Sequence, residues 1–553
     1  MGKRTGVLVL SIGATFLAIF LLSGAQRNSR GNNPSSSLWL WTLAALAIDP
    51  GEPGTAKVLT YHNDVARTGQ NLEERILTLA NVNVKKFGKV GFLDTDGLVD
   101  AEPLYVSNLT IAGRAHNVVF AATEHDSVYA FDADTLTQLW HVSVIGANET
   151  PSDDRGCAQV SPEIGITSTP VISLNGNGGV MYLVAMSKDR EGNYFQRLHA
   201  LDISTGAEMS GSPTVIEATF PNLKGHTTFD PKQYKERASL LLLDGIVYTT
   251  WASHCDEGDY TGWVIGYNAA TLQQANVLNL TPNGNDGAIW MSGAGPAADP
   301  QGYIYFLDAN GTFDSTLNSS GFPIHGDFGN AFLKLSSTGG KLSVADYFNT
   351  HDTEAQSGKD LDLGSGGGLV LPDYKDGSAN IWQLAVGAGK DKRIYVVDRN
   401  NMGKFHRKKN TGIYQEIDRA FTGQVFSMPA YFNNTLYFGA INDTLKAFSI
   451  SNAKLLPEPT SKSAAHFAYP GATPSISANG TSNGIVWAVE ARGSDAGILH
   501  AYDARDLTNE LYSSAQSYGR DAFADNKFIT PMIANGRVFV GTLTGVMVFG
   551  LLP

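Results

Sequence analysis

Short apolar runs, each followed by a polar turn, recur along the chain from about residue 86 onward. In the stretch 117–144 (NVVFAATEHDSVYAFDADTLTQLWHVSV), an apolar strand over 118–122 precedes a polar turn, a second strand over 128–131 and a third strand that carries Trp140. Glycine is abundant, with 59 residues, and Gly, Asn, Asp and Ser separate the apolar runs. This pattern is typical of many short strands joined by tight turns, so the sequence predicts an all-β protein.

The same pattern occurs in eight copies, at 117–144, 180–208, 246–273, 303–341, 382–404, 436–455, 485–511 and 538–552. A further short strand with a proline or glycine corner precedes most copies, for example at 166–174, 472–480 and 529–536. Each unit therefore supplies four strands. Four-stranded units repeated radially form a propeller, and we predict an eight-bladed β-propeller of four-stranded antiparallel blades.

The two ends of the repeat region predict how the ring closes. The final copy ends just after its third strand, at Pro553. The strand expected near Phe87 to Leu93 has no blade of its own. We therefore predict that this strand pairs beside Val546 to Gly550 and supplies the missing outer strand of the last blade.

Charge and composition narrow the classes of partner. The formal net charge is −13, with 42% hydrophobic and 17% charged residues. This apolar content is too high for a disordered chain. The acidity argues against nucleic acid, because phosphate binding needs clustered Lys and Arg. We interpret the basic run at 406–409 as a solvated loop, and expect a protein, glycan or small-molecule ligand as the partner.

The N-terminus predicts a targeting segment. Lys3 and Arg4 precede an apolar run from Gly6 to Leu22, and small residues follow at 23–25. This order is typical of a secretory signal peptide over residues 1–25; the alternative is an uncleaved membrane anchor. Residues 26–55 have the composition of a linker, and the propeller is expected over 56–553. We predict an exported protein, periplasmic or secreted, with no contact with a membrane beyond that possible anchor.

Cys157 and Cys255 are the two cysteines of the chain. In an oxidising compartment an isolated pair of this kind often forms a disulfide, which is the pairing predicted here. Two separate thiols are the alternative. The sequence contains no CxxCH, so no c-type haem is expected.

The AFDADTLTQLW stretch resembles the repeat of pyrroloquinoline quinone (PQQ) enzymes, with the consensus A-x-D-x-x-T-G-x-x-x-W. Ala130, Asp132, Thr135 and Trp140 match it, whereas Leu136 replaces the glycine. Ala200, Asp202, Thr205 and Gly206 match a second copy that lacks the Trp. The resemblance covers residues 86–553 and is greatest to the family's exported bacterial propellers without an assigned activity. It implies the propeller fold, and docking of neighbouring blades by the Ala and Trp.

The same resemblance implies a candidate site of PQQ and Ca²⁺. A divalent cation polarises the quinone and prefers oxygen ligands, for which the matching positions are Glu257, Asn310 and Asp360. The catalytic base of the family falls on the Asp360-Leu361-Asp362 stretch. The basic residue that hydrogen-bonds the quinone oxygens falls on Lys390.

Further candidates for the cofactor pocket are Trp290, Thr167 and Thr169, with Arg155 and Glu163 nearby. The family's enzymes carry a vicinal disulfide over the cofactor and a tryptophan beneath it. This chain has no adjacent cysteines, and Trp290 is several residues out of register. Every candidate also has a structural alternative: a solvated turn, a turn cap or a core position.

Two functions from different classes remain open. The missing cysteine pair and the displaced tryptophan favour a binding or scaffold module outside the cytoplasm, with no cofactor. The series Glu257, Asn310, Asp360, Asp362 and Lys390 favours the alternative, a PQQ- and calcium-dependent dehydrogenase of alcohols or sugars. The sequence has no GxSxG, HExxH or P-loop motif that would indicate another enzyme.

Overall fold

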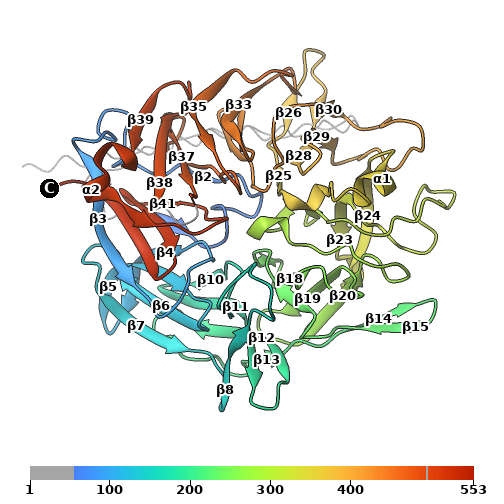
Figure 1. The fold of residues 1–553 in the computed structure, drawn as a ribbon, viewed down its shortest axis with the longest axis horizontal. Coiled ribbons are helices and arrows are strands. Elements are labelled where there is room, and N and C mark those ends of the chain that lie inside the picture. Colours follow the sequence, from blue (N-terminus) through green and yellow to red (C-terminus); the bar gives the residue numbers. More distant parts are fainter. Residues whose placement is uncertain (1–54, 493–495) are drawn as a thin grey trace, which may run out of the picture. The chain divides into compact units, whose positions relative to one another are not determined.

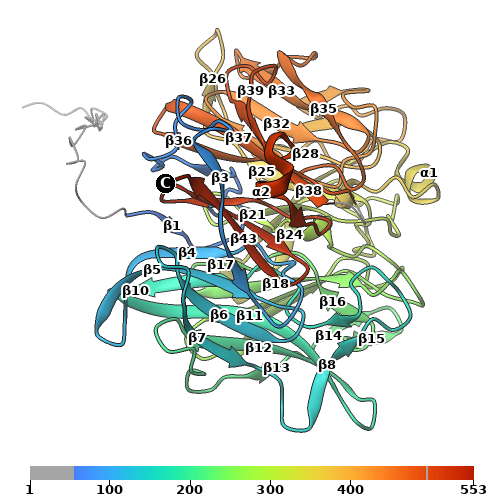
Figure 2. The ribbon, with the colours of Figure 1, turned by 60° about the vertical axis from the view of Figure 1, so that its left-hand side comes forward.

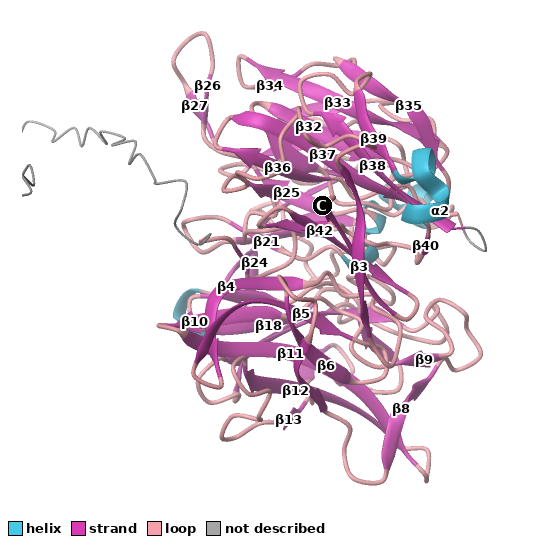
Figure 3. Ribbon diagram, turned by 90° about the vertical axis from the view of Figure 1, so that its left-hand side faces the viewer, coloured by secondary structure: helices cyan, strands magenta, loops and turns pink. Residues whose placement is uncertain are grey.

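Alternating β-branched and aromatic residues, interrupted by Gly, Asn and Asp, form the strands of the protein. The computed structural model describes residues 55–492 and 496–553, and strands make up nearly all of its regular structure (Figure 3). The predicted targeting segment 1–25 and all but the last residue of the predicted linker 26–55 lie outside the described residues. Among the described residues, no helix has the length and apolar character needed to cross a membrane.

Eight antiparallel sheets follow one another around a ring, which confirms the predicted eight-bladed propeller (Figure 1). The main strands of the first four blades are β1 (Lys57–Val58), β4 (Leu104–Ile111), β5 (Arg114–Ala122), β6 (Ser127–Asp132) and β7 (Gln138–Ser143); β10 (Val171–Asn175), β11 (Gly178–Asp189), β12 (Tyr194–Asp202) and β13 (Thr214–Val215); β17 (Leu241–Leu243), β18 (Ile246–Ser253), β19 (Trp263–Asn268) and β20 (Gln274–Asn279); β21 (Ala297–Ala298), β22 (Ile304–Leu307), β23 (Ala331–Ser336) and β24 (Ser343–Asn349).

The main strands of the last four blades are β25 (Gly368–Val370), β28 (Leu384–Ala388), β29 (Ile394–Asp398) and β30 (Gln415–Ile417); β31 (Ala430–Phe432), β32 (Thr435–Gly439), β33 (Asp443–Ser451) and β35 (Ser461–Phe467); β36 (Ser475–Asn479), β37 (Ser482–Glu490), β38 (Ala496–Asp503) and β39 (Glu510–Ser513); β41 (Met532–Ala534), β42 (Arg537–Thr542), β43 (Gly545–Leu551) and β3 (Phe87–Asp94). Several blades carry extra short strands, such as β16 (Tyr234–Glu236), because their loops are long enough to pair with the sheet.

The ring closes as the repeat count predicts. Strand β3 pairs antiparallel with β43, with Phe87 opposite Leu551 and Leu93 opposite Val546. In both ribbon views the blue strand β3 therefore lies beside the red C-terminal strands (Figures 1 and 2). Phe87 is fully buried and its ring lies 5.3 Å from that of Trp487 in the preceding blade. The first strand of the repeat region thus joins the last two blades.

Neighbouring blades dock through the tryptophan of the repeat. The indole Nε1 of Trp140 in β7 donates to the carbonyl of Ile203 in the second blade, at 3.1 Å. Gly206 allows this approach, because a Cβ atom there would lie 2.9 Å from the Trp140 ring. The docking role that the resemblance implied for Trp140 is therefore present.

The segment 57–71, which we call the axial segment, touches the innermost strands around the ring. Strand β1 pairs with β4 in the first blade, and β2 (Gln70–Asn71) pairs with β36 in the seventh. Backbone carbonyls between them accept hydrogen bonds from successive blades: Leu59 from Ile172, Val65 from Ala298, Ala66 from Val370, Thr68 from Tyr431 and Gly69 from Ile476. Asn71 donates to the carbonyl of Ile533 in the eighth blade. The axial segment therefore connects blades that the repeat pattern leaves independent.

Arg67 lies at the centre of this arrangement and is completely buried. Its guanidinium donates to the carbonyls of Pro296, Leu240 and Tyr61, at 2.9, 3.0 and 2.8 Å. It also donates to the hydroxyl of Thr60 at 2.7 Å. One side chain thus holds the axial segment to the third and fourth blades.

Replacing Arg67 with Leu should destabilise the ring. The substitution leaves several buried acceptors without a donor, and we expect a loss of about 3 kcal/mol or more. Chemical denaturation monitored by tryptophan fluorescence measures this loss in the free energy of unfolding. Arg75→Leu is the matched control, because Arg75 is exposed. Equal effects of the two substitutions would contradict the role given to Arg67.

Candidate functional site

A cavity of about 580 Å³ opens among the loops around the propeller axis. Its volume lies within the usual range of small-molecule sites. The lining side chains come from at least six blades. They include Asp100, Lys235, Arg237, Asp256, Asp286, Trp290, Asn310, Asp360, Asp362, Lys390, Phe426, Tyr469, Lys527 and Phe528.

Three of the predicted catalytic residues form one group in this cavity. The ammonium of Lys390 lies 2.6 Å from Asp360 Oδ1 and 2.7 Å from Asp362 Oδ1. Trp290 Nε1 donates to Asp362 Oδ2 at 3.2 Å, and Asn310 Nδ2 donates to Asp360 Oδ1 at 2.8 Å. The structure therefore brings together five of the residues selected from the sequence.

Tight turns place these side chains. Lys390 follows β28 and precedes β29, and its backbone N–H donates to the carbonyl of Asp362 at 2.9 Å. Gly389 is required beside it, because a Cβ atom there would lie 2.6 Å from Asp362 O. The two loops that carry the group are thus joined by their backbones.

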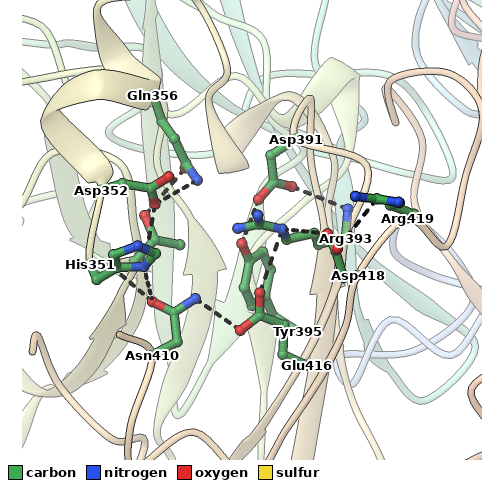
Figure 4. Close-up of polar contacts among 11 residues, drawn as sticks. His351, Asp352, Gln356, Asp391, Arg393, Tyr395, Asn410, Glu416, Asp418 and Arg419 are labelled. Atoms are coloured by element: carbon green, nitrogen blue, oxygen red, sulfur yellow. Dashed lines mark hydrogen bonds and ion pairs between the residues drawn. The ribbon is translucent and has the colours of Figure 1, made fainter. Parts of the chain in front are cut away.

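A polar network holds the turn behind Lys390 (Figure 4). The buried carboxyl of Asp391 accepts a hydrogen bond from the Tyr395 hydroxyl. Arg393 lies 3.5 Å from Glu416 and 3.0 Å from Asp418. Burial raises the pKa of Asp391 to about 6. Because Asp391 follows Lys390 directly, this network supports the backbone turn that carries Lys390.

The two carboxylates beside Lys390 differ in their surroundings. The Asp362 side chain is 1% exposed, and burial raises its pKa against the attraction of Lys390. The Asp360 side chain is 74% exposed, and its Oδ2 has no hydrogen-bond partner in the described part of the chain. Burial alone would lower the pKa of Lys390, but the two carboxylates more than offset this and raise it. Lys390 is therefore a cation held by two anions.

Four aromatic rings form a closed quartet on one wall of the cavity. Trp290 contacts Phe426, Phe426 contacts Tyr469, Tyr469 contacts Phe528 and Phe528 contacts Trp290, with centroid distances of 5.9, 5.6, 5.8 and 6.3 Å. Lys390 Nζ lies 5.8 Å from the ring centroids of both Trp290 and Phe426. Trp290 therefore lines the cavity, although it is displaced from the register of the repeat.

Glu257, the predicted metal ligand, does not line the cavity. Its side chain is exposed, and the carboxylate that this turn presents to the cavity is that of Asp256. Cys255 and Asp256 both have positive φ, at 59° and 52°, which turns the chain one residue earlier than the repeat register suggests.

The two predicted threonines also lie away from the cavity lining. Thr167 donates to Glu124 Oε2 at 2.9 Å, and the Thr169 hydroxyl accepts from the backbone N–H of Glu102 at 2.9 Å. Glu102 in turn accepts from the backbone N–H of His62 in the axial segment. Thr169 therefore belongs to the packing around that segment. Arg155 and Glu163 are not cavity-lining residues either.

Sequence reasoning missed Lys235, Arg237, Phe426, Lys527 and Phe528, all of which line the cavity. Lys235 and Arg237 are only 3% and 7% exposed. The run Lys235-Glu236-Arg237 sits between apolar residues at the start of a blade. Charged residues at the start of a blade face the propeller axis, so this position in the repeat was the one feature of the sequence that could have indicated them.

The residues present do not complete a calcium site. Asn310 Oδ1 is buried without a partner and Asp360 offers a free oxygen, which gives two donors. The third expected ligand lies outside the cavity, and Lys390 Nζ already contacts both carboxylates. Within the described ranges, Cys157, His254 and Cys255 form the one group of three potential metal-binding side chains, and its sulfurs form a disulfide.

That disulfide confirms the predicted pairing. The Cα atoms of Cys157 and Cys255 lie 6.3 Å apart, within the usual range. Gln159 and Asp256, close to the two sulfurs in sequence, line the cavity. The bridge therefore joins two loops at the mouth of the cavity.

Comparison with known proteins supports the fold. A quinohemoprotein alcohol dehydrogenase from Comamonas testosteroni has a TM-score of 0.59 and 13% identity, over 90% of this chain and 80% of its own. The two proteins share the propeller fold. The quinohemoprotein alcohol dehydrogenase ADHIIG from Pseudomonas putida HK5 gives 0.58 and 14%, over 90% and 80%. A europium-containing methanol dehydrogenase gives 0.57 and 12%, over 91% and 99%.

No family model matches the sequence, and no curated protein matches it. Identities of 12–14% show a shared fold and leave the chemistry to the residues of the cavity. The cavity at the axis of the propeller is where those residues meet.

Replacing both cysteines with Ser should lower the thermal midpoint. The bridge closes a loop of 98 residues, and its removal should cost up to about 4–5 kcal/mol in the chain-entropy model. Differential scanning calorimetry with and without reductant measures this. Reductant should lower the midpoint of the unsubstituted protein and leave that of the variant unchanged; sensitivity of both would contradict the assignment.

Replacing Lys390 with Met should destabilise the protein by about 3 kcal/mol at pH 8, because it leaves a buried carboxylate unpaired. The pKa of Asp362 then rises further above its unfolded value. A carboxyl group whose pKa is higher in the folded than in the unfolded protein lowers the free energy of unfolding as the pH rises above the unfolded pKa. The loss of stability caused by Lys390→Met should therefore shrink toward pH 4. Urea denaturation across this range is the measurement. Lys392→Met, an exposed change in the same turn, is the control; a deficit independent of pH would contradict the argument.

Proposed function

We propose that the protein is an exported quinoprotein dehydrogenase that binds PQQ in the axial cavity and oxidises an alcohol or sugar. The observation that supports this most directly is the grouping of Asp360, Asp362 and Lys390 with Trp290 and Asn310. These residues come from separate repeats, and they were selected from the sequence for this chemistry.

The shape and composition of the cavity fit a planar quinone. The aromatic quartet provides an apolar wall, and Lys390 provides an ammonium that can hydrogen-bond ring oxygens. When bound, PQQ would supply a two-electron acceptor for the alcohol. No step is assigned to calcium, because the donor set is incomplete.

Asp360 is the residue best placed to remove the hydroxyl proton of the substrate. Its Oδ1 is engaged by Lys390 and Asn310, while Oδ2 faces no donor in the described part of the chain. General-base catalysis requires such an accessible oxygen within hydrogen-bond reach. Asp362 has both oxygens occupied by Lys390 and Trp290, so its role is to position them.

Export is part of the proposal. The Cys157–Cys255 disulfide supports it, since such bonds persist in oxidising compartments. The net charge of −13 continues to argue against nucleic acid as a partner.

A binding or scaffold module is the second candidate. The hairpin of β14 (Thr219–Asn222) and β15 (Gly225–Thr228) carries Leu223 at its tip, with 75% of that residue exposed. The hairpin of β26 (Tyr374–Lys375) and β27 (Ile381–Trp382) exposes 59% of Ile381. Exposed apolar residues on two projecting hairpins favour a protein partner on the outer surface.

The test is to add PQQ to the purified full chain, remove the excess and record the spectrum of the bound quinone. Dye reduction is then measured with a panel of alcohols and sugars. Asp360→Asn should retain the quinone and lower the rate by about 100-fold or more. Glu257→Gln should change neither, because its side chain lies outside the cavity. Failure to retain the quinone would contradict the dehydrogenase and leave the binding module.

A further inference from the structure

Three cationic side chains line the cavity without an ion pair. The side chains of Lys235 and Arg237 make no hydrogen bond or ion pair in the described part of the chain, and both residues are more than nine-tenths buried. Lys527 makes one long contact, donating to the carbonyl of Ala158 at 3.4 Å. We call these three residues the cationic wall. It differs from Lys390, whose charge two carboxylates balance.

The surrounding acids do not neutralise the cationic wall. Asp100 lines the same part of the cavity and acts on Lys235 and Lys527, but it lies outside ion-pair distance and accepts a hydrogen bond from Asn526. Glu124 is buried, and burial together with Asp100 raises its pKa well above the usual range. Among the described residues, Asp100 is the carboxylate that acts on both Lys235 and Lys527.

This excess of charge has an energetic consequence. Burial and the neighbouring Arg237 lower the pKa of Lys235 to about 8, and burial lowers the pKa of Lys527. Burying cations without a counter-charge is unfavourable, so such groups are normally paired. The structure keeps room for Arg237: Gly293, with φ of 91°, lies where a Cβ would come 2.9 Å from the guanidinium. A ligand that supplies negative charge would remove the imbalance.

The rest of the cavity limits the kind of anion. Arg237 lies over the ring of Phe528, with its Cζ 5.4 Å from the centroid, so the cationic wall borders the aromatic quartet. The acids Asp256, Asp286 and Asp360 also line the cavity. Burial, and the charge of Asp256, raise the pKa of Asp286. An anionic group of the ligand would therefore be placed at the cationic wall and away from these acids.

We propose that Lys235, Arg237 and Lys527 form a carboxylate-binding site for the ligand of the axial cavity. The guanidinium of Arg237 presents the planar fork that matches a carboxylate, and the two ammonium groups supply the remaining charge. PQQ and an acidic substrate would both bring a carboxylate to this wall. The identity of the ligand depends on the proposed function, whereas the presence of a carboxylate-binding site does not.

The experiment uses the full chain without PQQ and two probes that differ in one group, gluconate and its neutral counterpart sorbitol. Calorimetric titration should show gluconate binding at least about tenfold more tightly than sorbitol, which corresponds to about 1.4 kcal/mol. Arg237→Met and Lys235→Met should abolish this preference. Lys224→Met, an exposed substitution on the β14–β15 hairpin, should not.

The thermal midpoint gives a second readout. If the cations await a ligand, removing one should raise the midpoint of the ligand-free protein, because an unpaired buried charge is lost. If they only support the fold, the same substitutions should lower it, and the proposal is wrong. Equal binding of gluconate and sorbitol, together with PQQ binding unaffected by Arg237→Met, would also overturn it.

Titration with PQQ separates the two sources of the carboxylate. Competition between PQQ and gluconate assigns the wall to the cofactor, whereas simultaneous binding assigns it to the substrate; both outcomes support the site. If gluconate binds through Arg237 and PQQ does not bind, the quinoprotein function fails and the carboxylate site stands. Inorganic phosphate is a further probe, and its binding in preference to gluconate would contradict a carboxylate ligand.

Discussion

The ring depends on one short stretch of chain that belongs to no blade. The carbonyls of the axial segment satisfy inner-strand N–H groups in successive blades, and Arg67 satisfies carbonyls of the third and fourth. Blades of a propeller otherwise contact only their neighbours, so their geometry at the axis is loosely defined. Buried backbone groups need partners, and at the axis of this propeller the axial segment supplies them. It thereby fixes how far apart the inner strands lie.

This constraint also determines where a ligand can bind. In four blades a cavity residue lies in the chain before the inner strand, and a residue bonded to the axial segment follows it, at the start of that strand or within it. Arg237 precedes Leu240, Asp362 precedes Val370, Phe426 precedes Tyr431 and Lys527 precedes Ile533. The same short stretches of chain therefore carry both the cavity lining and the contacts with the axial segment. A shift of the axial segment would move the lining residues together, which links the stability of the ring to the geometry of the cavity.

The repeats made much of the fold predictable from the sequence. Eight copies and an unpaired strand near Phe87 were enough to predict the closure with β43, because strand pairing follows from counting. Asp360, Asp362 and Lys390 were found by their position within the repeat. Glu257 lies outside the cavity lining, in a disulfide-bonded turn where two residues have positive φ, a conformation that spacing does not reveal. The role of the axial segment could not be predicted from the sequence. Arg67 and the neighbouring backbone contact backbone groups of the blades, and such groups are the same whatever the residue type, so these contacts leave no sequence pattern.

The distribution of charge in the cavity bears on the choice between an enzyme and a scaffold. A scaffold that used only its outer surface would be more stable with apolar residues at Lys235 and Arg237, since unpaired buried charge is unfavourable. The same cavity shows that the fold can pair its charges, because Lys390 has two carboxylates and a hydrogen-bonded network behind it. One paired cation and three unpaired ones therefore line a single space. Lys390, the paired cation, is held in place by its two carboxylates. The cations of the cationic wall retain the capacity to attract an anion, which is what a ligand-binding cavity requires.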